Sequence, residues 1–266
     1  MRKNILVVTK GHPFDKPAFS ELFDSMRGLT WTHVEQPAAL HLFHPDAAKE
    51  FAAFVLYDVP GVEFRTPEPP VLRDPPEHFK RGFEALLDQG YPLIFLHHAM
   101  AGWPAWDAYA EVIGARFFYQ PGSYKGCAYP DSGYVFPVKH RVRPVAAHPV
   151  TAGLEDGFEI EDELYLFQML EDDIVPLMRS DHRFVRDNFY SAALALKARM
   201  WSREGWEHPE GSNLVAWARR ARNSPAVAIQ CGNDASAYRN EGFRKLLRNA
   251  IDWATSEEAL TWARQH

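Results

Sequence analysis

Cysteine is nearly absent from the chain, which has only Cys127 and Cys231 among its 266 residues. A disulfide scaffold needs more cysteines, and the two cysteines lie too far apart in sequence to form the closely spaced pair that a zinc knuckle needs. The sequence therefore excludes a disulfide-rich fold and a Cys₄ or Cys₂His₂ zinc knuckle. Two cysteines also fit a reducing compartment, so we expect a cytoplasmic protein.

Long apolar runs and an excess of basic charge are missing as well. No apolar run is long enough to cross a bilayer, and Lys10 interrupts the run Ile5–Val8, which is too short for a signal-peptide core. The formal net charge is −6 and the isoelectric point is about 6.1, so a basic surface that binds nucleic acid is not expected. We therefore expect neither a membrane nor a nucleic acid as a partner.

The chain has enough hydrophobic residues, 46%, for one large core, and we expect a single domain over residues 1–266. Apolar strand candidates at Asn4–Thr9, Ala53–Tyr57 and Leu93–Leu96 alternate with segments of helical periodicity as far as Gly114. This alternation predicts an α/β fold with a flavodoxin-like, doubly wound, mostly parallel sheet. We expect the three strands to be adjacent and parallel, with the first in the middle.

The second half of the chain has a different pattern. Its extended segments follow one another without a long helix, which predicts an antiparallel extension of the sheet. These segments are Tyr134–Val145, Phe158–Leu166 and Ile174–Arg179, followed by a strand pair at Leu214–Arg219 and Ala226–Gln230. We also predict a fifth strand at Arg116–Tyr119, a proline-rich loop at Glu63–Pro76, a helix or an aromatic loop at Ala192–Trp201, and an amphipathic helix over Phe243–Ala254.

The segment 92–106 combines a buried strand, a sharp turn and the start of a helix. Leu93–Leu96 is the strand, His97 and His98 follow it, and a helix is predicted from Trp103. Such a turn lifts a side chain to the carboxyl edge of a sheet, as a nucleophile elbow does. Here the tip carries two imidazoles where a Ser or Cys would be expected.

Polar residues follow four of the predicted strands. Ligands of open α/β sheets bind beyond the carboxyl ends of the strands, so we expect these residues to surround one pocket. They are His12 with Asp15, then Asp58, then His97 with His98, and finally Asn233 with Asp234.

Each of these side chains has more than one interpretation. His97 or His98 could be a general base, a metal ligand, or a buried imidazole bonded to a carbonyl group. Glu163 and Tyr165 lie two residues apart on an extended segment, so they should share a face and could reach the pocket or pair with surface arginines. Three aromatic residues could stack on the apolar face of a sugar or belong to the core: Trp103, Tyr124 and Tyr129.

Together these motifs resemble the ThuA-like family of trehalose-utilisation proteins, which have a class I glutamine amidotransferase-like fold. The resemblance covers nearly the whole chain and is carried by segments 5–15, 55–58, 96–99 with Trp103 and Pro104, 148–154, 162–165, and 232–234 with 237–240. Family members often have Gly-His-Asp at the late motif, whereas this chain has Asn233 in place of the histidine. The resemblance implies a carbohydrate-derived small molecule as partner.

A comparison with amidotransferases at the same motifs predicts that glutamine hydrolysis is absent. Their elbow pattern, placed over segment 92–99, puts His97 at the position of the nucleophilic cysteine. The late motif puts Gly232 at the position of the catalytic histidine. Because Cys127 and Cys231 lie elsewhere in the sequence, thioester chemistry should be absent.

The resemblance and the strand-end residues leave three functional hypotheses. The first is acid–base chemistry on an oxidised keto sugar, with His98 or His97 as base, Asp58 orienting it, and Glu163 or Asp234 as acid. The substrate-binding set would be His12, Asp15, Trp103, Tyr124, Tyr165 and Asn233.

The second hypothesis is a non-catalytic small-molecule-binding or assembly subunit, which leaves a homo-oligomer open. The third is a metal-assisted hydrolase through His12, His98 and Asp58. These ligands would all come from different elements, and Asn233 removes one potential ligand. We therefore expect no stoichiometric transition metal, and the sequence names no cofactor.

Overall fold

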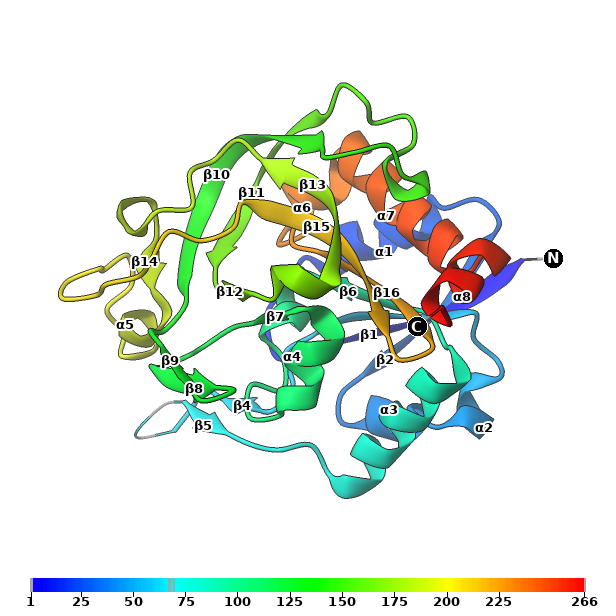
Figure 1. The fold of residues 1–266 in the computed structure, drawn as a ribbon, viewed down its shortest axis with the longest axis horizontal. Helices are drawn as coiled ribbons and strands as arrows, with labels where there is room; N and C mark the ends of the chain where they lie inside the picture. The colour runs from blue at the N-terminus through cyan, green and yellow to red at the C-terminus, as the bar shows by residue number, and fades with distance from the viewer. Residues whose placement is uncertain (1, 67, 69, 266) are drawn as a thin grey trace.

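A ten-stranded sheet runs through the molecule (Figure 1). The computed structural model describes residues 2–66, 68 and 70–265. The strands are ordered β11-β10-β13-β15-β16-β6-β3-β1-β2, and β14 (Tyr190–Ser191) also pairs with β10. The parallel half contains β1 (Lys3–Lys10), β2 (Leu29–Glu35), β3 (Ala53–Asp58), β6 (Leu93–Leu96) and β16 (Ser224–Ile229). The antiparallel half contains β10 (Gly133–Pro144), β11 (Phe158–Leu166), β13 (Ile174–Ser180) and β15 (Leu214–Ala221).

The parallel half confirms the predicted adjacency but corrects the predicted order. Val55 of β3 pairs with Val7 of β1 on one side and with Ile94 of β6 on the other, so β3 is the middle strand of the three. β1 lies between β3 and the edge strand β2, whose residues are mostly exposed or half-buried. The apolar runs of β1 and β3 are equally suited to burial on both faces, so apolarity could not rank them.

The antiparallel half contains the predicted extended segments and the predicted β15–β16 pair. The expected fifth strand at Arg116–Tyr119 is wrong. Only β7 (Ala115–Arg116) is a strand, and it pairs with β12 (Gln168–Met169) in a separate two-stranded sheet. After Arg116, the carbonyl oxygen of Phe118 accepts the N–H of Ser132, a hydrogen bond that does not belong to any strand pair.

Two short hairpins lie near the parallel half. The segment predicted as a loop, Glu63–Pro76, contributes to a hairpin of β4 (Val62–Glu63) and β5 (Val71–Leu72), and Pro67 and Pro69 within it lie outside the described residues. The prediction missed this hairpin because it has only two residue pairs. The second hairpin joins β8 (Gly122–Tyr124) to β9 (Cys127–Tyr129).

Helices cover both faces of the parallel half. Figure 1 shows α7 and α8 on one side of β16 and β6, and α3 and α4 on the other. The first layer contains α1 (Lys16–Asp24), α6 (Ala235–Arg239), α7 (Glu241–Ala254) and α8 (Glu257–Ala263), and buries one core cluster. The second layer contains α2 (Pro45–Ala48), α3 (Glu77–Gln89) and α4 (Asp107–Ile113), and buries the other.

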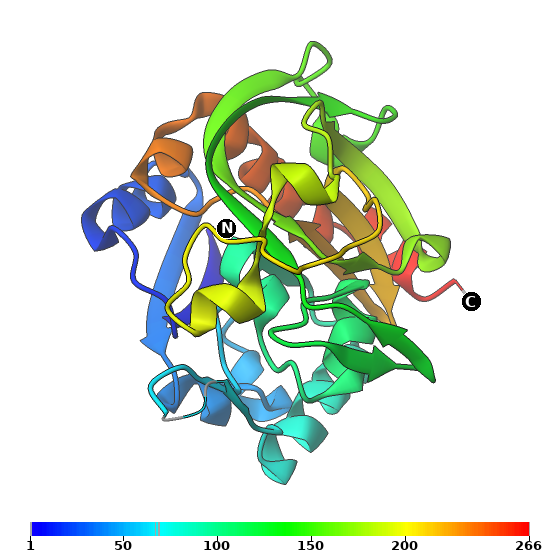
Figure 2. The ribbon, with the colours of Figure 1, turned by 90° about the vertical axis from the view of Figure 1, so that its left-hand side faces the viewer.

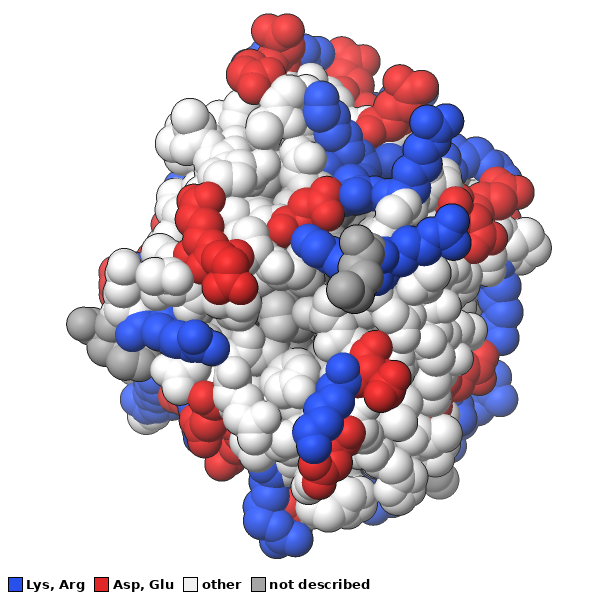
Figure 3. Space-filling model, turned by 90° about the vertical axis from the view of Figure 1, so that its right-hand side faces the viewer, with Lys and Arg blue, Asp and Glu red and all other residues white. Residues whose placement is uncertain are grey.

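The helix α7 shows why the sequence pattern was reliable in this region. Its predicted apolar positions are all buried, and each fully buried leucine contributes about 1.5–3 kcal/mol. The side chain of Asn240 accepts the N–H of Phe243 at 3.0 Å and caps the first turn. None of the helices in the described residues is both long and apolar enough to span a membrane. On the face shown in Figure 3, acidic and basic side chains are interspersed.

Candidate functional site

The sharp turn after β6 holds His97 at the carboxyl edge of the sheet. Residues His97–Ala101 form a 3₁₀ turn directly after the strand. The helix predicted from Trp103 begins only at Asp107, because Trp103 has a φ of 40°, which is outside the helical region. His97 has a backbone φ of 35°, a conformation that side-chain-bearing residues rarely adopt. Its side chain is completely buried. The turn therefore has the strand–turn geometry of a nucleophile elbow, with an imidazole at its tip.

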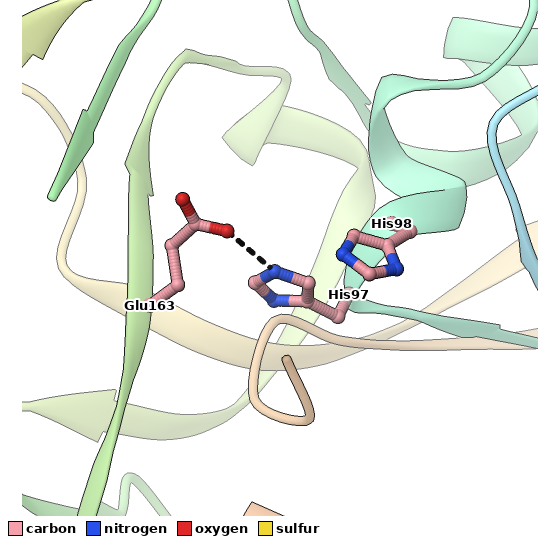
Figure 4. Close-up of side chains that lie close together, drawn as sticks. All are labelled: His97, His98 and Glu163. Carbon is pink, nitrogen blue, oxygen red and sulfur yellow. Dashed lines mark hydrogen bonds and ion pairs between the residues drawn. The ribbon is translucent and has the colours of Figure 1, made fainter. Parts of the chain in front are cut away.

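Both ring nitrogens of His97 have hydrogen-bond partners. One is Gln230, which directly follows β16, and the other is Glu163 in the antiparallel half. Nδ1 lies 2.5 Å from the carbonyl oxygen of Gln230 and must donate to it. Nε2 lies 3.0 Å from Oε2 of Glu163, a carboxylate on β11 (Figure 4). A carboxylate can only accept, so an ionised Glu163 requires protons on both nitrogens of His97. In this form the arrangement is an imidazolium paired with a carboxylate.

The pKa of His97 is consistent with this ion pair. Burial lowers the pKa, but the hydrogen bond and the negative charge of Glu163, helped by Asp162, outweigh burial and raise it above its usual range. Glu163 is on the open side of the pair, with 14% of its side chain exposed, whereas His97 has none. The carboxylate is thus the member of the pair that a ligand can reach.

A buried carboxylate, Asp162, fixes the loop beside this pair. Its Oδ1 accepts the N–H groups of Asn233 at 3.0 Å and Glu163 at 2.9 Å, and its Oδ2 accepts the N–H of Gly232 at 2.6 Å. Burial raises the pKa of Asp162 to about 6, against the effects of His97 and these donors. Gly232 has a φ of 119°, which favours glycine at the turn. β11 and the loop after β16 are therefore joined at Asp162.

His98 lies next to the ion pair but has different surroundings. Its Nε2 lies 3.2 Å from Oδ1 of Asn233, and its Nδ1 is buried without a hydrogen-bond partner among the described residues. Burial and the nearby His97 and His12 hold the pKa of His98 well below its usual range, so the ring is neutral. The ring centroid of His12 is 4.1 Å away. Surrounding protein atoms lower the pKa of His12 too, although part of its side chain is exposed.

A cavity of about 420 Å³ lies beside these groups. Its polar lining comes from His12, His98, Glu163, Tyr165 and Arg65, so Glu163 and Tyr165 do share a face as their spacing predicted. Its apolar lining includes Phe64, Phe117, Tyr119, Tyr134, Leu196 and Met200. The segment with α5 (Ala192–Leu196), yellow in Figure 2, supplies part of this wall. The volume is within the range of small-molecule sites, about 300–1,000 Å³.

Asp58 does not take the predicted place beside His98. Its Oδ2 accepts the side-chain N–H of Gln36 at 2.7 Å, and its Oδ1 has no partner among the described residues. Successive side chains of β3 point to opposite faces, so Asp58 points away from Tyr57, which packs on His98 with a centroid distance of 4.6 Å. Burial raises the pKa of Asp58 to about 7. The predictions that Asp58 orients the histidine base and that it binds a metal ion together with His12 and His98 are therefore wrong.

His97 and Asn233 contact residues that line the cavity without lining it themselves, whereas four other predicted site residues neither line the cavity nor bond to the His97–Glu163 pair. Asp15 accepts the N–H of Ala18 and caps α1, and Asp234 caps α6 through the N–H groups of Ser236 and Ala237. Both follow strands because a helix begins there, so a capping role explains them.

The other two are aromatic. Trp103 packs against Phe79 at a centroid distance of 5.5 Å, in the core cluster on the face of α3. Tyr124 lies on β8, with the guanidinium carbon of Arg116 5.1 Å from its ring centroid and its hydroxyl donating to Glu111. Neither lines the cavity. Aromatic residues are common in the core and in hairpins, and composition alone could not separate these positions from a sugar site.

One group among the described residues could hold a metal ion. Single donor atoms of His97, His98 and Glu163 lie within 4.8 Å of one another. Ligands about 2.0–2.2 Å from a tetrahedral ion are about 3.3–3.6 Å apart, and Nε2 of His97 already pairs with Glu163. His98 would also have to give up Asn233 as a partner of Nε2. In the structure, His97 and Glu163 therefore form an ion pair, and the neutral ring of His98 lies beside it.

Neither cysteine occupies the elbow tip, where His97 lies. Cys127 is exposed on β9, and Cys231 is completely buried, with burial raising the pKa of its thiol well above the usual range. A thiolate nucleophile needs access and a lowered pKa. The expected absence of thiol-dependent glutamine hydrolysis stays a prediction.

Sequence reasoning missed several residues that shape the site. Gln230 holds His97 through its carbonyl group, and its side chain accepts the N–H of Tyr165 at 2.8 Å. An amide side chain directly after the apolar run of β16 was the available signal. Tyr119, Tyr134 and Met200 line the cavity but lie in segments with no motif.

Comparisons with known proteins agree with this architecture. The model of the ThuA family, described as trehalose utilisation, matches residues 5–254. No curated protein matches the chain.

Solved structures extend the comparison to the fold. A protein from Parabacteroides merdae, described as ThuA-like, has a TM-score of 0.68 and 15% identity, over 96% of this chain and 91% of that one. A protein from Bacteroides uniformis with the same description has a TM-score of 0.60 and 14% identity, over 96% and 92%. PurLQS from Thermotoga maritima has a TM-score of 0.52 and 11% identity, over 95% and 99%. At these identities the likeness shows the fold alone, and it confirms the predicted class I glutamine amidotransferase-like fold.

Proposed function

Because the chain belongs to the ThuA family over residues 5–254, we propose that its cavity binds a carbohydrate-derived metabolite and that Glu163 moves a proton there. The observation that carries this proposal is the ion pair between His97 and Glu163 at the cavity. A completely buried imidazolium beside a reachable carboxylate is costly unless the pair is well bonded, and here Gln230 completes the bonding. Groups of this kind concentrate at functional sites.

The chemistry that fits is removal of a proton from a carbon next to a carbonyl group, as in a keto sugar. Glu163, held as a carboxylate by His97, would take the proton from carbon. The C–H bond breaks, an O–H bond forms on Glu163, and the electron pair moves onto the carbonyl oxygen as an enolate. Returning the proton from Glu163 to carbon or oxygen completes a transfer without a change in oxidation state. A positioned base of this kind contributes about 10²–10⁴-fold to a rate.

The assignment differs from the sequence hypothesis in the identity of the base. His98 is neutral, but its Nε2 is engaged by Asn233 and its Nδ1 is buried. His97 cannot reach a ligand because it is completely buried. Glu163 lines the cavity and is therefore the base, with His97 as its positioning partner.

The lining supports a sugar-like ligand. Hydroxyl groups need donors and acceptors, which His12, Glu163 and Arg65 offer, and the apolar faces of a sugar ring suit aromatic walls such as Phe117 and Tyr119. The two-cysteine composition, with Cys127 exposed, supports the cytoplasm as the proposed location.

The test is exchange of solvent deuterium into keto sugars, measured by mass spectrometry. With 3-ketoglucose and 3-ketotrehalose as probes, we expect exchange that Glu163→Gln lowers about 100-fold or more. Glu161→Gln is the matched control, because Glu161 lies on the same strand and pairs with Lys139 outside the cavity. This control should keep nearly full activity.

Two results would contradict the proposal. Equal exchange by the wild type and Glu163→Gln would exclude Glu163 as the base. Binding of the probes without any exchange would leave the fold with a non-catalytic role in small-molecule binding.

A further inference from the structure

Large apolar side chains are exposed at three of the described positions. They are Val145, Met200 and Trp201, with exposed fractions of 41%, 53% and 49%. Two of them are neighbours in sequence, and Met200 also lines the cavity that contains Glu163. Trp201 does not line the cavity itself, but its ring lies beside Tyr134, which does.

The ring of Trp201 is held in place although half of the residue is exposed. Its backbone N–H donates to the hydroxyl of Tyr134 at 3.0 Å, and Tyr134 lines the cavity. The ring centroid lies 5.5 Å from that of Tyr134 and 5.6 Å from that of Tyr190. The guanidinium carbon of Arg203 lies 4.4 Å from the Tyr190 centroid. An indole fixed in this way presents a flat surface to solvent.

The backbone at Trp201 is unfavourable for a tryptophan. Its φ is 59°, and Ala198 in the same turn has a φ of 58°. Glycine and asparagine adopt this left-handed conformation most readily, whereas bulky side chains rarely do. Backbone strain of this kind concentrates at functional sites, and the exposed half of Trp201 is free to contact a ligand.

We propose that Trp201 and Met200 form an outer subsite that binds the second sugar ring of a disaccharide or glycoside. The first ring would occupy the cavity, so this inference rests on the proposed function. A pyranose ring has one face of C–H groups, which packs against an indole and buries apolar surface from both partners.

A sugar ring fits this surface better than a protein partner does. The apolar surface consists of two side chains, and charged residues flank it, with Arg199 paired to Glu204. A stable protein–protein interface buries about 1,200–2,000 Å² in total, which is far more than two side chains offer. One ring of a small ligand needs only the area of one indole.

The experiment compares trehalose with methyl α-glucoside by titration calorimetry. We expect the wild type to bind trehalose about tenfold or more tightly than methyl α-glucoside. Trp201→Asn removes the indole and suits the observed φ, so its thermal stability should be equal to or above that of the wild type. This variant should lose the preference for trehalose while its affinity for methyl α-glucoside stays within about twofold.

Two further variants make the test specific. Trp201→Phe keeps an aromatic face and should retain most of the preference. Val145→Asn changes the third exposed apolar residue, which does not line the cavity, and should leave both affinities unchanged.

The outcomes separate this inference from the proposed function. Equal affinities for the two sugars, or a preference that survives in Trp201→Asn, would overturn the outer subsite and leave the cavity's proposed role intact. If neither sugar binds, the outer subsite is overturned, and the deuterium exchange into keto sugars remains the separate test of the proposed function. A Trp201→Asn variant that only changes the oligomeric state, seen by sedimentation, would show that the surface joins two copies of the chain and would also overturn the subsite.

Discussion

The two halves of the sheet each bury one aspartate near the candidate site, and the surroundings of the two carboxyl groups differ. Asp58 ends β3 in the parallel half, where one oxygen accepts the side-chain N–H of Gln36 and the other has no partner among the described residues. Asp162 lies on β11 in the antiparallel half and accepts three backbone N–H groups. Asp58 therefore has few hydrogen bonds to its carboxyl group, whereas Asp162 has both of its oxygens bonded.

This difference shows that a carboxylate at a strand end is not by itself a site. Burial raises the pKa of Asp58 to about 7 and that of Asp162 to about 6, so Asp162 is the more readily ionised of the two at neutral pH. Asp162 also fixes the backbone of Glu163 and the loop that carries Asn233. The antiparallel half, where the sequence had fewer motifs, therefore supplies both the reachable carboxylate and its support.

The largest effect should come from replacing Asp162. In Asp162→Ala, three backbone donors lose their acceptor, and leaving buried donors unsatisfied costs about 1–3 kcal/mol each, so the free energy of unfolding should fall by about 3 kcal/mol or more. Asp234→Ala is the control, because it loses only a helix cap, worth about 1 kcal/mol. Urea unfolding measures both variants. Equal losses would show that Asp162 does not hold the loop.

The second effect concerns Asp58 and depends on pH. Its pKa rises from 3.8 when unfolded to about 7 when folded, so its contribution to stability is complete below the unfolded value and is lost as pH rises through 7. Asp58→Asn lacks this loss, and its stability relative to the wild type should rise by up to about 4 kcal/mol between about pH 4 and pH 8. Unfolding curves across that range check the slope. Parallel curves for the two proteins would contradict the assignment of the raised pKa to Asp58.

The smallest effect should be that of metal ions. Because His97 is already paired with Glu163, we predict that the purified protein holds no stoichiometric transition metal and that added zinc shifts its melting temperature by less than about 2 °C. Elemental analysis after dialysis without chelator gives the content. Near one equivalent per chain, lost in His97→Ala or His98→Ala, would instead make the three donors of the site a metal centre.

The sequence predicted the parallel half well, because its strands are buried on both faces and leave apolar runs such as Leu93–Leu96. It also placed His97 and His98 at a turn after a strand. The sequence could not predict the order of β1 and β3 in the sheet, because both strands are equally apolar.

The remaining site depends on contacts between distant parts of the chain. The pairing of His97 with Glu163 joins residues 66 positions apart, and the bond between Asp162 and Gly232 joins residues 70 apart. We selected Asp58, Asp15 and Asp234 because each follows a predicted strand. That position alone does not distinguish a carboxyl group that caps a helix, or points into the core, from one that contacts a ligand. Trp201 lies in a segment that periodicity left open between helix and loop, so its exposure could not be predicted.

The most direct test of the central claim is an NMR titration of the His97 ring in the wild type and in Glu163→Gln. The account requires a protonated His97 that holds Glu163 as a carboxylate, so the wild-type pKa should lie above its usual value of 6.5. Removing the negative charge leaves burial as the main influence, and the pKa of His97 should then fall below 6.5. A pKa that Glu163→Gln leaves unchanged, or a His97 that is already neutral at about pH 6 in the wild type, would contradict the account.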